Sequence, residues 1–254
     1  MNLNSHTKNM YLVIGMTADL SSIKATFWNG LESWCSHINM VVAIQARVMP
    51  RDIPLKTCKY IHLTVDSDDV KQGVNRLVRI ARARDHQRNR ILSGVAHLPF
   101  ESITMIDMDV NLPSWSAFMD AQAKLSTYDV VCANGYELHP RTKRRQVYDT
   151  FPLVLENGLW MYKHTTRNRQ QTLFEDIMKH DMFPVRYCFG GMAVYASDIW
   201  KTPECNFRVR KTKFEAGRQS CEHLRFQNCL RTKRNLTNIG ILSNLLLYRA
   251  WDPH

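Results

Sequence analysis

Short apolar runs alternate with amphipathic stretches through the first half of the sequence, and this alternation constrains the fold more than any other feature. Apolar runs with the length of buried β-strands occupy residues 11–15, 40–46, 60–65, 103–106 and 128–133. Apolar side chains at helical spacing occupy residues 22–36, 70–90 and 113–125. Because strands that alternate with helices favour a sheet covered by helices on both faces, we predict an α/β fold.

The alternation loosens after residue 135. A basic loop (139–145), a helix (172–179), a strand behind a Gly-Gly turn (187–196) and a helix (220–230) follow, which indicates something other than a plain alternating sheet. The 254 residues are 44% hydrophobic and contain no repeat, low-complexity tract or linker. We therefore expect one domain over residues 1–254.

Two aspartates, Asp107 and Asp109, follow the apolar run 103–106 at alternate positions. Open α/β sheets bind ligands at the carboxyl ends of their strands. A helix cap does not explain the pair, since Ser114 is better placed to cap the next helix. Mn²⁺ and Mg²⁺ take oxygen ligands and commonly share them with substrate phosphates, so the pair predicts such an ion. A second pair, Asp66 and Asp68, is better explained as a helix cap.

The net charge of +11 favours an anionic partner: a phosphorylated ligand, a polyanion or an anionic membrane surface. Two alternatives follow from it and from the acidic pair. One is a basic nucleic-acid-binding protein, although no helix-turn-helix, zinc or aromatic RNA-binding pattern accompanies the basic runs, so we expect no nucleic acid as partner. The other is a metal-dependent phosphotransferase or nuclease, against which the lack of a further acidic cluster counts.

The cysteines and the amino-terminal residues bear on the cellular compartment. Seven cysteines contain no CxxC pair and leave an odd one, which favours neither a zinc ribbon nor a disulfide framework and fits a reducing compartment. No apolar run approaches the roughly eighteen residues of a membrane span, and residues 1–16 do not show the charged leader and apolar core that are typical of a signal peptide. We expect a cytoplasmic protein, in the host cytoplasm if the source is a virus, with peripheral membrane contact left open.

Five short motifs occur in one order across residues 84–229. They are Arg88-Asn89-Arg90-Ile91-Leu92, Asp107-Met108-Asp109, Tyr148-Asp149-Thr150, Phe189-Gly190-Gly191-Met192-Ala193-Val194 and Cys221-Glu222-His223. Together they resemble nucleotide-sugar glycosyltransferases of the GT-A fold, in particular fungal capsule-associated α-1,3-mannosyltransferases and Golgi mannan polymerase subunits. The resemblance implies a Rossmann-like mixed sheet flanked by helices, with a nucleotide-binding half (1–110) and an acceptor-binding half (111–254).

The activity that the resemblance implies is the metal-dependent transfer of a hexose or pentose. The donor would be a UDP- or GDP-linked sugar, and the acceptor a hydroxyl of a glycan or glycoprotein. Mn²⁺ or Mg²⁺ would neutralise the departing diphosphate.

The resemblance also assigns roles to particular residues of this sequence. The metal ligands would be Asp107, Asp109 and His254, although a terminal histidine can equally be a frayed end. The donor contacts would be Thr17, Asp66, Arg84, Arg88 and Asp107. Glu222 would be catalytic, as a base or as a group that holds the acceptor, against the plain alternative of a first-turn helix residue. The acceptor contacts would be Gly190, Gly191 and His223.

Overall fold

The computed structural model describes residues 10–16, 23–46, 55–64, 76–94, 98–161, 166–208 and 221–249. The strands are β1 (Met10–Met16), β2 (Asn39–Ala46), β3 (Lys59–Thr64), β4 (Phe100–Asp107), β5 (Val130–Leu138), β6 (Arg145–Val147), β7 (Val154–Leu155), β8 (Met182–Tyr187), β9 (Met192–Ala196) and β10 (Ile239–Tyr248). The helices are α1 (Ala25–His37), α2 (Arg76–Gly94), α3 (Trp115–Lys124), α5 (Arg167–Ile177), α6 (Ser197–Trp200) and α7 (Glu222–Arg234).

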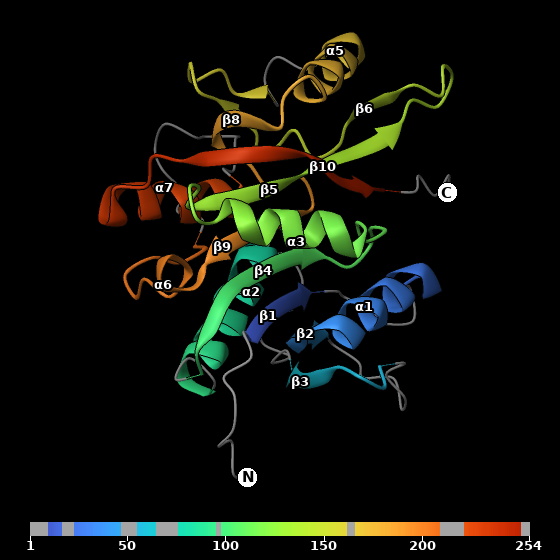
Figure 1. Cartoon of the computed structure of the whole chain (residues 1–254). Helices are drawn as coiled ribbons and strands as arrows, with labels where there is room; N and C mark the ends of the chain where they lie inside the picture. Colours follow the sequence, from blue (N-terminus) through green and yellow to red (C-terminus); the bar gives the residue numbers. More distant parts are fainter. Residues whose placement is uncertain are drawn as a thin grey trace.

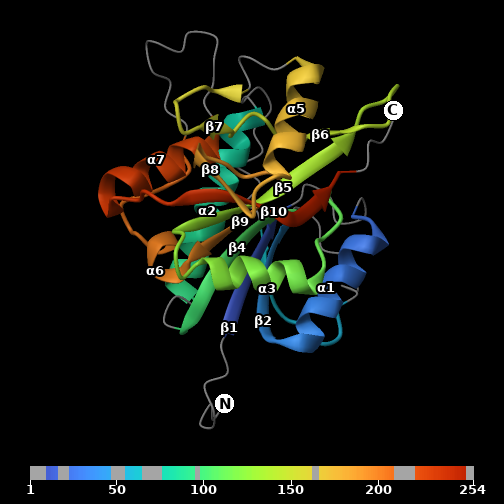
Figure 2. The same cartoon turned by 45° about the horizontal axis from the view of Figure 1, so that its top comes forward.

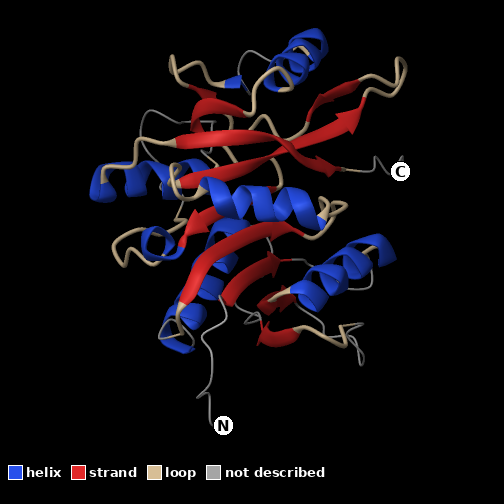
Figure 3. Cartoon of the chain, viewed as in Figure 1, coloured by secondary structure: helices blue, strands red, loops and turns tan. Residues whose placement is uncertain are grey.

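The strands of the described residues form one mixed sheet of ten strands, which Figure 3 shows as a single twisted layer. Nine of them follow the order β3-β2-β1-β4-β9-β5-β10-β8-β7, and β6 pairs with β5. β3, β2, β1 and β4 run parallel, whereas β9 lies antiparallel between β4 and β5. The first half of the chain therefore supplies a parallel unit, and the second half extends it with a mixed one (Figure 1).

The sheet has a topological switch at β1. The chain moves from β1 through α1 to β2 and β3 on one side, and then returns through α2 to place β4 on the other side. Ligands of open α/β sheets bind outside the carboxyl ends of the strands at such a point. Met16 at the end of β1 stands in register with Asp107 at the end of β4, so the acidic pair begins at the switch.

Both faces of the sheet are buried, which explains why its strands read as continuous apolar runs. In β1, Leu12 and Ile14 point into one core and Val13 into the other, as the two-residue period of a strand requires. α1 and α3 cover the face on the side of Val13, where Trp34 stacks on Phe118 with ring centroids 4.3 Å apart. α2, α5, α6 and α7 cover the opposite face, and Figures 1 and 2 show α2 behind the sheet from α3.

The predicted α/β fold is confirmed, and the structure corrects three of its elements. The strand predicted over 187–196 behind the Gly-Gly turn is β9, which begins only at Met192; Tyr187 ends the preceding strand β8, and the chain reverses at Gly190 and Gly191 between the two. The helix predicted over 172–179 begins earlier, at Arg167, where Thr166 caps it. β10 was not predicted, although its ten-residue, largely apolar run 239–248 carries the signal of a buried strand.

The cysteines depart most from the sequence analysis, because six of the seven form disulfides. The pairs are Cys35–Cys58, Cys132–Cys188 and Cys205–Cys229, and Cys221 is free. The expectation that no disulfide framework exists is therefore wrong. Spacing along the chain does not reveal which cysteines meet across a sheet or between a helix and a loop.

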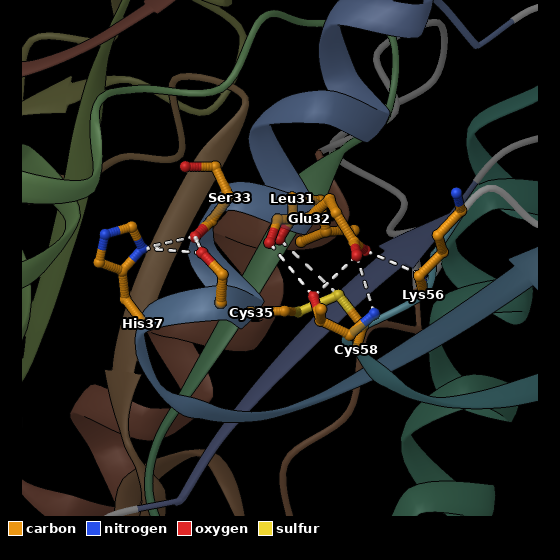
Figure 4. The surroundings of a disulfide bond; sticks show 9 residues. Leu31, Glu32, Ser33, Cys35, His37, Lys56 and Cys58 are labelled. Carbon is orange, nitrogen blue, oxygen red and sulfur yellow. Dashed lines mark hydrogen bonds between the residues drawn. A yellow bond between two sulfur atoms is a disulfide. The ribbon is translucent and has the colours of Figure 1, made fainter.

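The first disulfide ties α1 to the segment that leads into β3 (Figure 4). Beside it, the carboxylate of Glu32 accepts hydrogen bonds from the backbone amides of Lys56 and Thr57, at 3.0 and 2.8 Å. The disulfide and the carboxylate together fix α1 against the edge of the sheet.

Candidate active site

The acidic pair, Asp107 and Asp109, lies at the carboxyl end of β4, beside the topological switch. The backbone amide of Asp107 donates to the carbonyl of Gly191 at 2.8 Å, which holds the end of β4 against the Gly-Gly turn. Met108 is 2% exposed and packs against Gly15, where an added Cβ would lie 2.8 Å from its sulfur. With Met108 anchored inward, the side chains of Asp107 and Asp109 remain 26% and 55% exposed.

Each aspartate of the pair is met by an arginine. The Nη2 of Arg84, on α2, lies 3.0 Å from Oδ1 of Asp107. The Nη2 of Arg249, directly after β10, lies 3.4 Å from Oδ2 of Asp109, and its guanidinium stacks over the ring of Tyr148 at 4.9 Å. Two segments that are far apart in the sequence therefore converge on β4.

Glu222 lies on the other side of Arg84. Its Oε1 is 3.2 Å from the Nε of Arg84, and the thiol of Cys221 donates to its second oxygen at 3.5 Å. The side chain of Gln227 fixes this end of α7, because it bonds both the amide and the carbonyl of Cys188, at 3.1 and 2.7 Å. The disulfide Cys205–Cys229 adds a covalent tie.

The electrostatics of the centre are dominated by carboxyl groups. Burial raises the pKa of Asp107 to about 6 against the opposing charge of Arg84, and Asp109 and Glu222 add to the rise. Burial raises the pKa of Asp149 well above its usual range, and Asp107 and Glu222 raise it further. Among the described groups that act on one another here, four carboxyls face two guanidiniums, those of Arg84 and Arg249.

The Gly-Gly turn brings β9 close to β5. Gly190 and Gly191 have φ of 59° and 82°, in the left-handed region that side chains disfavour. A Cβ on Gly135 would lie 2.2 Å from the carbonyl oxygen of Gly190, and one on Gly190 would lie 2.3 Å from that of Ala133. Glycine is therefore required on both sides of this contact.

Three residues of the centre were missed as site residues. Tyr148 and Asp149 follow β6, and Arg249 follows β10. Asp149 adopts a left-handed backbone, with φ of 56°, and its carboxylate has no hydrogen bond or ion pair within the described ranges. The only signal for the first two was the motif Tyr148-Asp149-Thr150, and Arg249 carried no signal in the sequence.

The structure brings together Asp107, Asp109, Glu222, Arg84 and Gly191 from the predicted set. His223 is 2% exposed, and its ring stacks on that of Phe189 with 3.6 Å between the ring centroids. It therefore packs beside the Gly-Gly turn. Burial and the charge of Arg84 lower the pKa of His223 well below its usual range, which keeps the ring neutral.

The other predicted site residues lie elsewhere or outside the description. The guanidinium of Arg88 is buried and donates to the carbonyls of Trp200 and Thr202, which is a structural use. Thr17, Asp66 and His254 lie outside the described residues.

The acidic pair supplies two ligands for a divalent cation, and substrate phosphates or water would supply the others. Within the described ranges no three His, Cys, Asp or Glu side chains stand close enough to hold a metal ion alone. Mg²⁺ and Mn²⁺ sites that use substrate phosphates need only one or two carboxylates. Asp107 and Asp109 supply these, and the surplus of carboxyl groups around them favours a cation.

Comparison with known proteins addresses the fold. No family model matches the chain, and no curated protein matches it. The S. aureus TarS 1–349 structure is similar over 95% of this chain, with a TM-score of 0.54 and 13% identity, and the chain spans 60% of that structure.

Two further structures are more distant. The T. maritima inositol-1-phosphate CTP transferase has a TM-score of 0.49 and 8% identity, over 98% of this chain and 91% of that one. A197 from STIV has a TM-score of 0.47 and 13% identity, over 96% and 86%. The strand order and the likeness to TarS confirm the predicted GT-A type sheet flanked by helices.

Proposed function

We propose that the protein is a metal-dependent glycosyltransferase, which moves a hexose or pentose from a UDP- or GDP-linked donor to a hydroxyl of a glycan or glycoprotein. One observation supports it above the others: Asp107 and Asp109 stand at the carboxyl end of β4, beside the topological switch, in a centre where carboxyl groups outnumber guanidiniums. The fold is consistent with a nucleotide-linked substrate. The fungal mannosyltransferase resemblance stays a prediction.

Mn²⁺ or Mg²⁺ would be held by Asp107 and Asp109, with His254 proposed as a further ligand. When bound, the ion supplies Lewis-acid stabilisation of the departing nucleoside diphosphate. The two carboxylates would hold this ion at the carboxyl end of β4, where the diphosphate of the donor would bind. Thr17 and Asp66 are proposed donor contacts.

Glu222 is the proposed catalytic carboxylate on the acceptor side. Arg84 holds its carboxylate in a fixed orientation, which suits a group that orients an acceptor hydroxyl near the donor sugar. Gly190 and Gly191 stay proposed acceptor contacts. The places of their missing Cβ atoms are occupied by Ala133 and by Leu247 and Tyr148, so what the structure supports for the two glycines is the close packing of the turn.

Donor hydrolysis tests the proposed activity directly. Purified protein with Mn²⁺ is incubated with single nucleotide sugars, and release of UDP or GDP is measured. We expect slow hydrolysis of one donor, lost on chelation with EDTA and reduced at least about a hundredfold in Asp109→Asn. Asp120→Asn, on the exposed face of α3, is the matched control and should retain activity.

A thermal-shift panel separates this function from the alternative of nucleic-acid binding. Stabilisation by UDP or GDP only in the presence of Mn²⁺ supports the transferase. Stabilisation by an oligonucleotide, with no response to any nucleotide and metal, contradicts it.

The disulfides bear on where the protein matures. Disulfides persist in oxidising compartments and are rare in the cytosol. The three pairs therefore favour the lumen of a secretory organelle or the cell exterior over the cytoplasm that the sequence analysis expected. Among the helices that the structure describes, none combines the length and apolarity needed to span a bilayer.

A further inference from the structure

We propose that Arg84 is a positioning residue that joins the metal-binding carboxylate Asp107 to the acceptor-side carboxylate Glu222, and that it does not contact the donor diphosphate. The inference rests on the function proposed above. It replaces the role that the sequence suggested for Arg84 with one that the geometry supports.

The guanidinium of Arg84 donates hydrogen bonds through two of its three nitrogens. Its Nη2 donates to Asp107 at 3.0 Å and its Nε donates to Glu222 at 3.2 Å, so one rigid planar group spans the two carboxylates. The three residues come from α2, β4 and α7, which lie apart in the sequence. The bridge therefore sets the distance between the donor half and the acceptor half of the centre.

Burial keeps Arg84 from reaching a diphosphate. Its side chain is 3% exposed and lies over the ring of Phe189, with 5.3 Å between the guanidinium carbon and the ring centroid. The third nitrogen, Nη1, is enclosed and has no hydrogen-bond partner within the described ranges. The buried guanidinium therefore offers an oxygen of the donor diphosphate almost no exposed surface.

The bridge has a consequence for metal binding. A divalent cation and the guanidinium of Arg84 both draw on the carboxylate of Asp107, so the arginine opposes the metal while it orders Glu222. Removal of the positive charge should then strengthen metal binding and weaken catalysis. If Arg84 instead bound the diphosphate, removal of its charge should weaken nucleotide binding and leave the affinity for the metal alone unchanged.

The test compares Arg84→Gln and Arg84→Lys with the wild-type protein. Mn²⁺ binding is measured by electron paramagnetic resonance, nucleotide binding by calorimetry, and donor hydrolysis as kcat and KM. For Arg84→Gln we expect Mn²⁺ to bind about threefold tighter or more, kcat to fall about tenfold or more, and the donor KM to stay within about twofold. Arg82→Gln, which is exposed on the same helix, is the matched control and should leave all three unchanged.

Arg84→Lys keeps the positive charge but lacks the planar guanidinium that bonds both carboxylates. This variant tests the positioning role if Arg84→Gln fails to fold. We expect it to bind Mn²⁺ like the wild type and to lose turnover through kcat. Wild-type kcat in Arg84→Lys, or a raised donor KM with unaltered Mn²⁺ affinity in either variant, overturns the positioning role.

A readout that does not depend on activity separates this inference from the proposed function. Unfolding free energies of Arg84→Lys, Glu222→Gln and the double variant form a thermodynamic cycle. Non-additive losses support the bridge, and additive losses contradict it. If the wild-type protein binds neither Mn²⁺ nor a nucleotide, the proposed function fails while the cycle still decides whether Arg84 and Glu222 are coupled.

Discussion

At the scale of single residues, Asp149 differs from the other three carboxylates of the centre, each of which has an arginine partner. Its carboxylate has no partner within the described ranges, it faces the charges of Asp107 and Glu222, and its backbone is left-handed. A left-handed residue other than glycine costs about 1 kcal/mol or more, least for aspartate and asparagine. A strained backbone and an unpaired carboxyl group at one residue indicate that it serves the site and not the fold.

Asp149→Asn should therefore raise the stability of the protein and lower its activity. Asparagine tolerates the same backbone and cannot ionise. Since the folded-state pKa of Asp149 is raised, its ionised form costs stability, and this cost grows as the pH rises through that pKa. We expect the variant to melt higher at pH 8, by about 1 kcal/mol of unfolding free energy, with the gain shrinking as the pH falls, while donor hydrolysis drops.

Calorimetric melting of both proteins from pH 5 to pH 8 checks this prediction. Asp120→Asn, whose carboxylate accepts a hydrogen bond from Asn244 at 2.9 Å, is the control and should show no such gain. A lower melting temperature for Asp149→Asn at pH 8 would show that the carboxylate is structurally paired.

At the scale of elements, the reversal between β8 and β9 organises the second half of the sheet. The left-handed turn at Gly190 and Gly191 lets β9 run antiparallel between β4 and β5. It also presents the carbonyl of Gly191 to the amide of Asp107, so the turn and the acidic pair form one unit. The motif around the two glycines predicted a turn here, but the pairing of β9 with two strands from the first 140 residues depends on contacts that sequence spacing does not encode.

Gly190→Ala should be strongly destabilising. Its Cβ would lie 2.3 Å from the carbonyl oxygen of Ala133, and its φ of 59° disfavours alanine. Overlap with backbone cannot be relieved by a rotamer change, so we expect a loss of about 3 kcal/mol or more in urea-unfolding free energy.

Gly94→Ala is the matched control for this prediction. Gly94 ends α2 and has nothing within 4 Å of an added Cβ, so we expect a change within about 0.5 kcal/mol. Equal effects of the two substitutions would contradict the close approach of β9 to β5.

At the scale of the whole molecule, three disulfides tie the helices and loops to the sheet. Cys35–Cys58 fixes α1, Cys132–Cys188 joins β5 to the end of β8, and Cys205–Cys229 fixes α7. The last two lie beside the elements that hold Glu222 and the Gly-Gly turn. The geometry of the centre therefore depends on covalent ties as well as on packing.

The disulfides predict one titratable thiol in the unfolded, non-reduced protein, that of Cys221. Reaction with a thiol reagent in guanidinium measures it directly, and seven reactive thiols would refute the pairing. Removal of Cys132–Cys188, which closes 56 residues, should cost roughly 4 kcal/mol of unfolding free energy, against roughly 3 kcal/mol for Cys35–Cys58, which closes 23. Urea unfolding of the two double-serine variants compares the costs.

The sequence by itself determined the α/β class, most strands and helices of the first half, and the position of the acidic pair at the end of β4. These follow from the periodicity of apolar residues, which is a local pattern and can be read directly from the sequence. Only the tertiary structure decided that β10 enters the sheet beside β5, that six cysteines pair, and that Arg84, Asp149 and Arg249 meet Asp107 and Asp109. Such contacts join residues up to 140 positions apart, as Arg249 and Asp109 are, and they are set by sheet topology and packing, which no spacing along the chain records.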